Sequence, residues 1–271
     1  MLQETWNILK TDFHEASINM ALDEALLRWH SEGKIPPTLR FYGWSTPTLS
    51  LGHFQKEKSI HFPGLEKHGC QLVRRLTGGS AVLHDDELTY SIVVSESHPK
   101  IPKTIREAYH VLSQGIKVGY KNLGIEAEYF IPERKKGKNR TAVCFEKPAF
   151  YELVVDGKKV SGNAQTRQKG VLLQHGSIPI TMNEDMLFDL FAFPSERKRE
   201  VNRRAFRQKA TTIEQITGKR YTYKEVQEAF YNGFQSSLGV SFKPFELDDN
   251  QWEEVYQLAK EKYKQTIPVQ H

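Results

Sequence analysis

Residues 71–95 read QLVRRLTGGSAVLHDDELTYSIVVS, and this stretch decides what kind of fold the chain adopts. Its apolar runs predict two strands, one before Gly78–Gly79 and one after a turn at Asp85–Asp86. Two glycines between strands let the backbone come close to a ligand, and Arg74–Arg75 would lie beside it. The alternative is a glycine bulge with both arginines on the surface.

The segments upstream of this stretch predict a helix followed by strands. From Ser17 apolar residues recur at steps of three and four, which is typical of an amphipathic helix. Asn19, Asp23 and Arg28 occupy the opposite, polar side of that helix. After it, TLRFYGW (38–44) and TLSLGHFQ (48–55) alternate as strands do, with a turn between them.

The segments downstream predict a second helix and a hairpin. A helix is expected over 104–123, with Gly124 as its stop signal, and EAEYF (126–130) as a short strand. Residues 132–142 are basic and without periodicity, which favours a loop. In YELVVDGKKVSG (151–162) the Asp-Gly pair predicts a two-residue turn, because both of its positions need a positive φ.

That hairpin fixes which side chains share a face. With a two-residue turn Val154 lies opposite Lys159, and Lys159 shares its face with Glu152 and Ser161. Because exposed lysines are common in hairpins, Lys159 taken alone would be a solvated residue beside Lys158.

The order of elements predicts an α+β fold, a mixed β-sheet with flanking helices. Residues 170–180 (GVLLQHGSIPI) predict another apolar strand, and from Asn183 onward the pattern is helical. We expect one domain over 1–248 and a C-terminal helix within 249–271 that packs on it.

Composition excludes fibrous and disordered classes. The 271 residues are 38% hydrophobic and 26% charged, with a net charge of +5 that favours acidic partners. No run is long and apolar enough for a bilayer, and the first residues do not resemble a signal peptide, so a cytoplasmic location is expected. Cys70 and Cys144 are then expected to be free thiols, with Cys70 buried and structural.

The sequence contains none of the common cofactor-binding motifs. The sequence lacks GxxxxGK[ST], GxGxxG after a strand, HExxH and paired CxxC motifs, so phosphate loops, dinucleotide sites and the usual zinc sites have no support. His53, His61, His68 and Cys70 lie close in sequence, but their spacing matches no usual set of metal ligands. We expect neither a metal nor a cofactor.

Three blocks in order carry a family resemblance. They are NMALDEALL (19–27), RRLTGGSAVLHDDELTYS (74–91) and AVCFEKPAFYELVVDGKKVSGNAQTRQKGVLLQHGSI (142–178). Over about residues 10–250 the chain resembles the biotin/lipoate-protein ligase family, and within it the octanoyltransferases of Gram-positive bacteria that act on the glycine cleavage H protein. The resemblance implies the biotin/lipoyl ligase-like fold.

The resemblance also implies site residues. It places the acyl-accepting nucleophile at Cys144 and an assisting lysine at Lys159. It implies, further, that the acyl group is bound by the backbone of Gly78, Gly79 and Ser80 together with Arg75, His84 and Gly162.

Thiol chemistry agrees with these roles. A thiol of pKa near 8.5 is only a few per cent ionised at pH 7, and thiolate is the attacking species, so a nearby ammonium raises the reactive fraction. The implied donor is octanoyl-acyl carrier protein, and the acceptor is the H protein or another lipoyl domain, with no nucleic acid or membrane partner. Basic clusters at Arg134–Arg140 and Arg197–Lys209 would dock such acidic partners or form solvated faces. Lys159→Ala is expected to keep the fold and slow acylation.

Three other functions stay open from the sequence. One is an ATP-dependent lipoate ligase, although Ser80 stands where ligases commonly have a third glycine and Glu87–Leu88 replaces their Gly-Asn. Another is an amidotransferase that moves a protein-bound octanoyl group. The third is a non-catalytic binder of acylated or lipoylated proteins.

Overall fold

A computed structural model describes residues 4–130 and 151–264. Its main sheet has the order β10-β11-β6-β2-β1-β12. The strands are β1 (Glu4–His14), β2 (Thr38–Trp44), β6 (Glu87–Ser95), β10 (Gly162–Gln168), β11 (Val171–Pro179) and β12 (Val240–Pro244). The first three pairs in that order are antiparallel, and β2, β1 and β12 are parallel. The predicted mixed sheet is therefore confirmed.

Two small sheets complete the strands. In one, β3 (Thr48–Leu51) lies between β4 (Gln71–Arg74) and β5 (Val82–His84). In the other, β8 (Leu153–Val155) lies between β7 (Glu128–Tyr129) and β9 (Lys158–Lys159). Asp156 and Gly157 have φ of 50° and 74°, and Val154 pairs with Lys159, so the predicted two-residue hairpin is confirmed.

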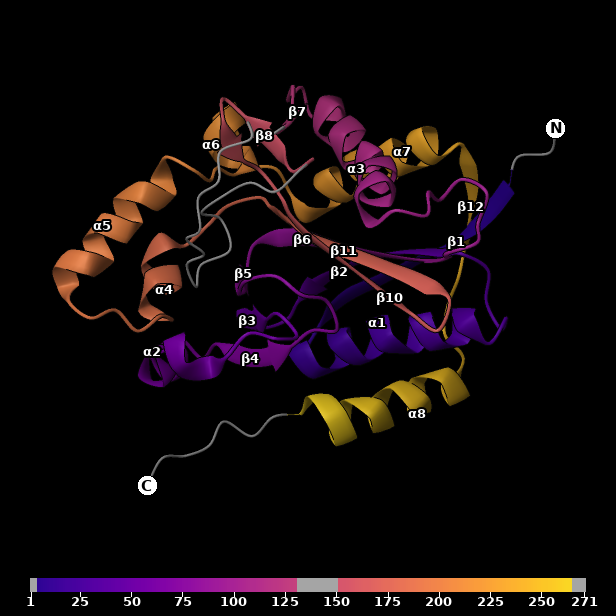
Figure 1. The fold of residues 1–271 in the computed structure, drawn as a ribbon, viewed down its shortest axis with the longest axis horizontal. Coiled ribbons are helices and arrows are strands. Elements are labelled where there is room, and N and C mark those ends of the chain that lie inside the picture. The colour runs from indigo at the N-terminus through magenta and orange to yellow at the C-terminus, as the bar shows by residue number, and fades with distance from the viewer. Residues whose placement is uncertain (1–3, 131–150, 265–271) are drawn as a thin grey trace.

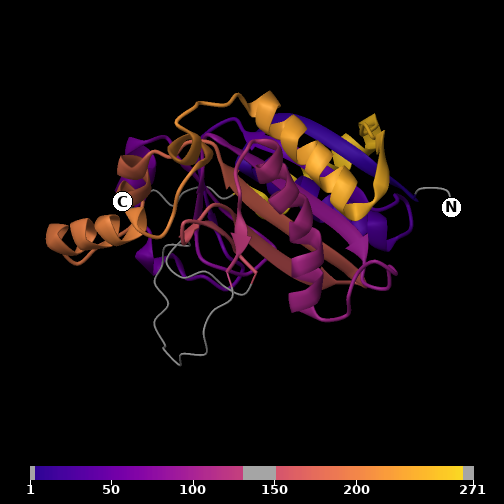
Figure 2. The same cartoon turned by 90° about the horizontal axis from the view of Figure 1, so that it is seen from above.

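Helices cover both faces of the main sheet (Figures 1 and 2). On one face lie α3 (Ile105–Asn122) and α7 (Tyr223–Leu238), which share a core with side chains of β2 and β6. On the other lies α1 (Ala16–Ser31), and α8 (Asp249–Leu258) with the π-turn η2 (Ala259–Tyr263) packs over α1. The helix expected over 104–123 is confirmed, and Gly124 follows it with φ of 76°.

The remaining helices lie at one end of the molecule, most of them near the β3–β5 sheet and α6 beside β8 (Figure 1). They are η1 (Glu57–Ser59), α2 (Phe62–Lys67), α4 (Glu184–Asp189), α5 (Glu196–Arg207) and α6 (Ile213–Thr217). Leu49, Leu65, Leu187, Phe188 and Phe206 belong to a hydrophobic core of their own there. In the part of the chain described, no helix is both long and apolar enough to cross a bilayer.

The polar side predicted for α1 is wrong for two residues. Asn19 and Asp23 are buried, because α1 lies between the sheet and α8 and not at the surface. Both side chains bond Arg40 of β2, which is itself fully buried. The polar residues of this helix therefore hold it on the sheet. The basic loop expected over 132–142 lies outside the described residues.

Candidate active site

The β8–β9 hairpin presents a buried ion pair. Lys159 is 2% exposed, and its Nζ donates to Oε1 of Glu152 at 2.6 Å. The face predicted for these two residues is confirmed, and the alternative of a solvated lysine is wrong. Since an unpaired charge is costly to bury, Glu152 is what allows an ammonium at this position.

The backbone of Lys159 ties the hairpin to the segment that follows α5. Its N–H donates to the carbonyl of Lys209 at 2.8 Å, and its own carbonyl accepts from the N–H of Thr211 at 3.0 Å. Lys159 and Ala210 form an isolated parallel bridge. Two segments 50 residues apart in sequence thus fix the position of the lysine.

The Gly78–Ser80 loop is shaped by Arg75. This arginine is 5% exposed, and its Nη2 donates to the carbonyls of Gly78 and Ser80 at 2.9 and 2.8 Å. Gly79 has φ of 100°, and its carbonyl comes so close to Gly52 that a Cβ there would lie 2.0 Å from the oxygen. The alternative with surface arginines is wrong for Arg75, which is a buried support of the loop.

Arg75 also begins a chain of buried hydrogen bonds toward α1. Its Nε donates to Oγ1 of Thr77 at 3.2 Å, and Thr77 lies 2.6 Å from Nε2 of His175. Nδ1 of His175 lies 3.1 Å from Oδ2 of Asp23. Because a carboxylate only accepts, Nδ1 of His175 donates to Asp23, and Nε2 accepts from Thr77.

A second, parallel chain runs from Arg75 to Glu87. Nη1 of Arg75 donates to Oγ of Ser50 at 3.1 Å, and that oxygen lies 2.8 Å from Nε2 of His84. Nδ1 of His84 lies 2.7 Å from Oε1 of Glu87, which also accepts from Thr89. Arg75 is therefore the first donor of two hydrogen-bonded chains, and each chain continues through a hydroxyl and an imidazole to a carboxylate.

Both carboxylates of these chains stay ionised although they are buried. Burial opposes ionisation of Asp23, but the hydrogen bond from His175 and the charge of Arg40 hold its pKa below the usual value. Burial likewise opposes ionisation of Glu87, and His84 and the hydroxyls around it lower its pKa. For His175 burial is the largest cause and lowers the pKa, which favours the neutral ring. Asp23 is thus kept ionised by an arginine and a histidine, and Glu87 by a histidine and two hydroxyls.

Gly162 connects the hairpin to this network. It opens β10 three residues after Lys159 and pairs with Ser177 of β11. Oγ of Ser177 donates to Oε2 of Glu87, which holds His84. The candidate residues on the hairpin and on the glycine loop are therefore linked through β11.

The predicted nucleophile Cys144 lies outside the described residues. The other cysteine, Cys70, is buried, and burial raises the pKa of its thiol to about 12. It is therefore a structural thiol, as expected from the sequence. Among the described residues no group of three or more His, Cys, Asp and Glu side chains is placed to hold a metal ion.

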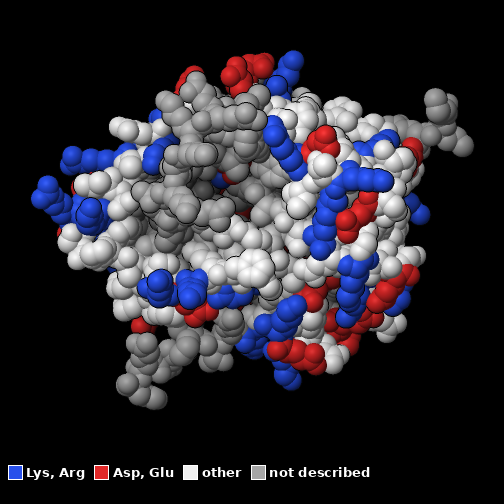
Figure 3. Space-filling view, viewed as in Figure 1, with Lys and Arg blue, Asp and Glu red and all other residues white. Residues whose placement is uncertain are grey.

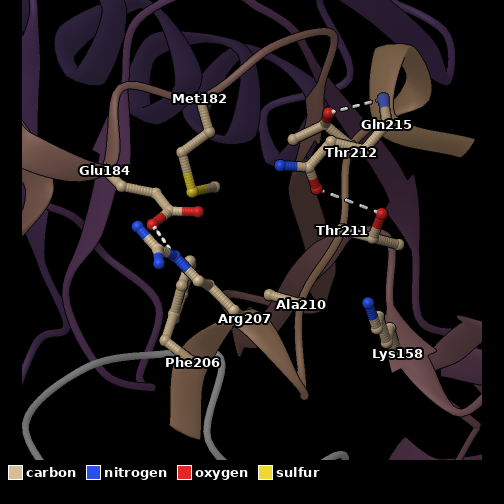
Figure 4. Close-up of a pocket in the computed structure, with 9 residues that line it drawn as sticks. All are labelled: Lys158, Met182, Glu184, Phe206, Arg207, Ala210, Thr211, Thr212 and Gln215. Carbon is tan, nitrogen blue, oxygen red and sulfur yellow. Dashed lines mark hydrogen bonds and ion pairs between the residues drawn. The ribbon is translucent and has the colours of Figure 1, made fainter. Parts of the chain in front are cut away.

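A cavity of about 320 Å³ lies beside the hairpin (Figure 4). Its wall mixes apolar and polar groups, among them Met182, Phe206, Lys158 and Thr211. Glu184 and Arg207, which form an ion pair, also line it. None of the described candidate residues lines this cavity, although Lys158 adjoins Lys159. The acyl site expected around the glycine loop is thus a separate place.

Asp23, Thr77 and His175 were missed as site residues in the sequence. Asp23 and His175 are 152 residues apart, so no local spacing joins them. Glu87 was noticed only as a departure from the ligase pattern, and its place three residues after His84 is the signal that connects it to the site.

Comparisons with known proteins place these features in a family context. Residues 15–235 match the family described as lipoyl protein ligase A/B catalytic domain. Octanoyltransferase LipM of Oceanobacillus iheyensis is 54% identical, with 97% of this chain and 96% of the relative covered. Octanoyltransferase LipM of Bacillus subtilis is 51% identical, with 97% of both chains covered.

Solved structures share the fold. A bipartite lipoate-protein ligase system of Thermoplasma acidophilum superposes with a TM-score of 0.79 at 23% identity, covering 96% of this chain and 93% of the other. A lipoate-protein ligase A bound with ATP gives a TM-score of 0.74 at 24% identity, covering 97% and 96%. The biotin/lipoyl ligase-like fold is confirmed.

Proposed function

The chain belongs to the lipoyl protein ligase A/B catalytic domain family and to its octanoyltransferase branch, and from that premise we propose how it transfers the octanoyl group. The identity of 51–54% over nearly the whole chain is the observation that carries the assignment. The reaction is the transfer of an octanoyl group from a carrier thioester to a protein lysine, a step of lipoate biosynthesis.

The first step forms an acyl-enzyme on Cys144. The thiolate adds to the carbonyl carbon of octanoyl-acyl carrier protein, the carbon–sulfur bond of the donor breaks, and the phosphopantetheine sulfur leaves and takes up a proton. A thioester is already activated, so this step uses no nucleotide. The buried ammonium of Lys159 supports the step, since a cation beside a thiol favours the thiolate and polarises the acyl carbonyl.

The second step passes the group to the acceptor. A neutral lysine amine of the lipoyl domain, such as that of the glycine cleavage H protein, adds to the enzyme thioester. Cys144 leaves as thiolate, and the amine loses a proton to give the amide. An amide is more stable than a thioester, which drives the transfer. The backbone of Gly78–Ser80, held by Arg75, binds the acyl group beside the reacting carbon.

A mass measurement tests the acyl-enzyme. Enzyme incubated with octanoyl-acyl carrier protein without ATP should gain the mass of one octanoyl group minus a hydrogen. Cys144→Ala should abolish the adduct and the transfer. Cys70→Ala is the matched control, because it removes the other thiol, which is buried, and should keep both.

The same assay separates the alternatives. An adduct that persists in Cys144→Ala would contradict the proposed nucleophile. Transfer that requires lipoate and ATP would identify a ligase, and transfer only from octanoyl-H protein would identify an amidotransferase. A stable complex without turnover would identify a binding protein.

A further inference from the structure

Helix α5 is strongly basic and fixed to the molecule by its inner face. Six of its twelve side chains are basic and two are acidic. On the inner side Arg199 pairs with Asp189, and Arg203 pairs with Asp185 of α4. Phe206 is buried in the core at this end of the molecule. The helix is therefore a rigid support for whatever its outer face binds.

The outer face of α5 has the composition of an interface. Arg197, Lys198 and Arg204 are exposed, and Val201 between them is 55% exposed. Within the described residues, neither Arg197 nor Lys198 has a carboxylate partner. Figure 3 shows basic side chains projecting at the edge of the molecule that α5 occupies in Figure 1. A charged rim around an apolar centre is the usual layout of a protein interface.

The end of α5 leads directly to the candidate active site. The carbonyl of Lys209 and the N–H of Thr211, which follow the helix, bond the backbone of Lys159. The 320 Å³ cavity is lined by the end of α5, by this segment and by Lys158 of the hairpin (Figure 4). A partner seated on α5 would thus lie next to a cavity that adjoins the hairpin lysine.

The lining of the cavity suits a slim chain with a phosphate at one end. Its volume is at the lower end of the roughly 300–1,000 Å³ typical of ligand pockets. Thr211 and Gln215 offer hydroxyl and amide groups, and Met182 and Phe206 offer apolar surface. Arg207, the last residue of α5, supplies a cation at the carrier end of the cavity. Amides, methyl groups and a phosphate are what a phosphopantetheine arm presents.

We infer that the outer face of α5 and this cavity form the docking site of the acyl carrier protein, which seats its acidic surface on Arg197, Lys198 and Val201 and passes its phosphopantetheine arm along the cavity. The inference rests on the proposed function. The donor fits better than the lipoyl domain, because a long arm bridges the distance from α5 to the hairpin, whereas an acceptor lysine is short and must come close with its whole domain.

Charge reversal at Arg197 and Lys198 tests the docking face. Both positions lie in the first turn of α5, where acidic residues favour the helix, so Arg197→Glu with Lys198→Glu leaves the helix folded. The KM for octanoyl-acyl carrier protein should rise about tenfold and lose most of its dependence on ionic strength. The KM for the lipoyl-domain acceptor and turnover of octanoyl-pantetheine should stay unchanged.

The matched control reverses two other exposed lysines, Lys103 and Lys243, which gives the same change in net charge. An equal rise in KM in this control would overturn the inference, since net charge alone would then explain it. A rise in the acceptor KM in place of the donor KM would also overturn it. If the unaltered enzyme transferred octanoyl from neither donor, the proposed function itself would fail, whereas normal transfer with an unchanged donor KM would remove only the docking face.

The arm has a test of its own. Arg207→Ala should raise the KM for octanoyl-phosphopantetheine about fivefold and leave kcat unchanged, because one ion contact to the phosphate at the α5 end of the cavity is lost. The KM for octanoyl-pantetheine, which lacks the phosphate, should not move. Equal effects on both donors would contradict the proposed path of the arm.

Discussion

Arg75 sets the geometry of the glycine loop because it donates hydrogen bonds to four residues at once. Its guanidinium donates to two loop carbonyls and to the hydroxyls of Ser50 and Thr77. Lysine could not replace it, since one ammonium lacks the planar fork of donors that reaches all of these oxygens. The loop is thus held by an interior network and keeps its shape without help from solvent-exposed groups.

His175 makes stability depend on pH. Burial lowers the pKa of the folded-state ring, so between that pKa and the unfolded value near 6.5 the unfolded chain binds more protons. The contribution is complete above about pH 7 and is lost as pH falls through about 6.5. Between about pH 7 and pH 5.5 the free energy of unfolding should fall more in the parent than in His175→Gln. Urea denaturation at both pH values measures this, and equal pH slopes would contradict it.

The pair of Lys159 and Glu152 gives the lysine a structural role beside the chemical role proposed for it. The sequence predicts that Lys159→Ala keeps the fold, but a buried carboxylate that loses the ammonium bonded to it costs about 3–5 kcal/mol. The double variant Lys159→Met with Glu152→Gln should recover most of that loss and still acylate slowly. Urea denaturation of the single and double variants checks the recovery. If both were equally unstable, the ion pair would not be the cause.

At the scale of elements, sequence reasoning succeeds where the signal is local. The hairpin follows from its Asp-Gly turn, and α3 follows from its apolar spacing and Gly124. By contrast β1 and β12 were not predicted as a pair, because they are parallel neighbours from opposite ends of the chain. Strand β10 reads GNAQTRQ and has no apolar alternation, so only its pairing with β11 defines it.

The same distinction applies to the candidate site. Lys159, Arg75 and His84 stand in recognisable blocks, so the sequence singles them out. Asp23 and His175, which end one chain of hydrogen bonds from Arg75, lie on α1 and β11, and only the packing of that helix on the sheet brings them together. The sequence thus identifies candidate residues by their type and motif. The buried hydrogen bonds that orient them form only when the helix packs on the sheet.

Helices α3 and α7 pack so closely that glycine is required between them. A Cβ at Gly233 of α7 would lie 2.5 Å from both the carbonyl oxygen of Gly115 and the backbone nitrogen of Gly119. In an open helix Gly→Ala gains up to about 1 kcal/mol, but here the added methyl must push two backbones apart. Gly233→Ala should therefore lower the free energy of unfolding by about 2 kcal/mol. The exposed Asn232→Ala in the same helix is the control and should be neutral or slightly stabilising.

In the whole molecule, different layers of helices and strands form separate hydrophobic cores. The sheet and the α3–α7 pair form the larger core, and α1 carries polar residues inward to Arg40 and apolar residues outward to α8. The end of the molecule with α4 and α5 is held by a separate core and by ion pairs. A partner docked at that end can therefore act on the hairpin without disturbing the main sheet.

Removing the C-terminal layer, α8 and η2, tests whether the rest of the chain is stable alone. Val255, Ala259 and Tyr263 are buried against α1, and Glu254 accepts hydrogen bonds from Arg28 and Trp29. Ending the chain at Leu247 would expose this side of α1, and losing those buried side chains should cost about 5 kcal/mol. A chain ending at Lys264 is the matched comparison, because both lack residues 265–271. We expect the shorter chain to melt at a markedly lower temperature in calorimetry and to bind a hydrophobic dye. Equal melting of the two chains would mean that residues 4–247 form a self-sufficient domain, with α8 an accessory layer.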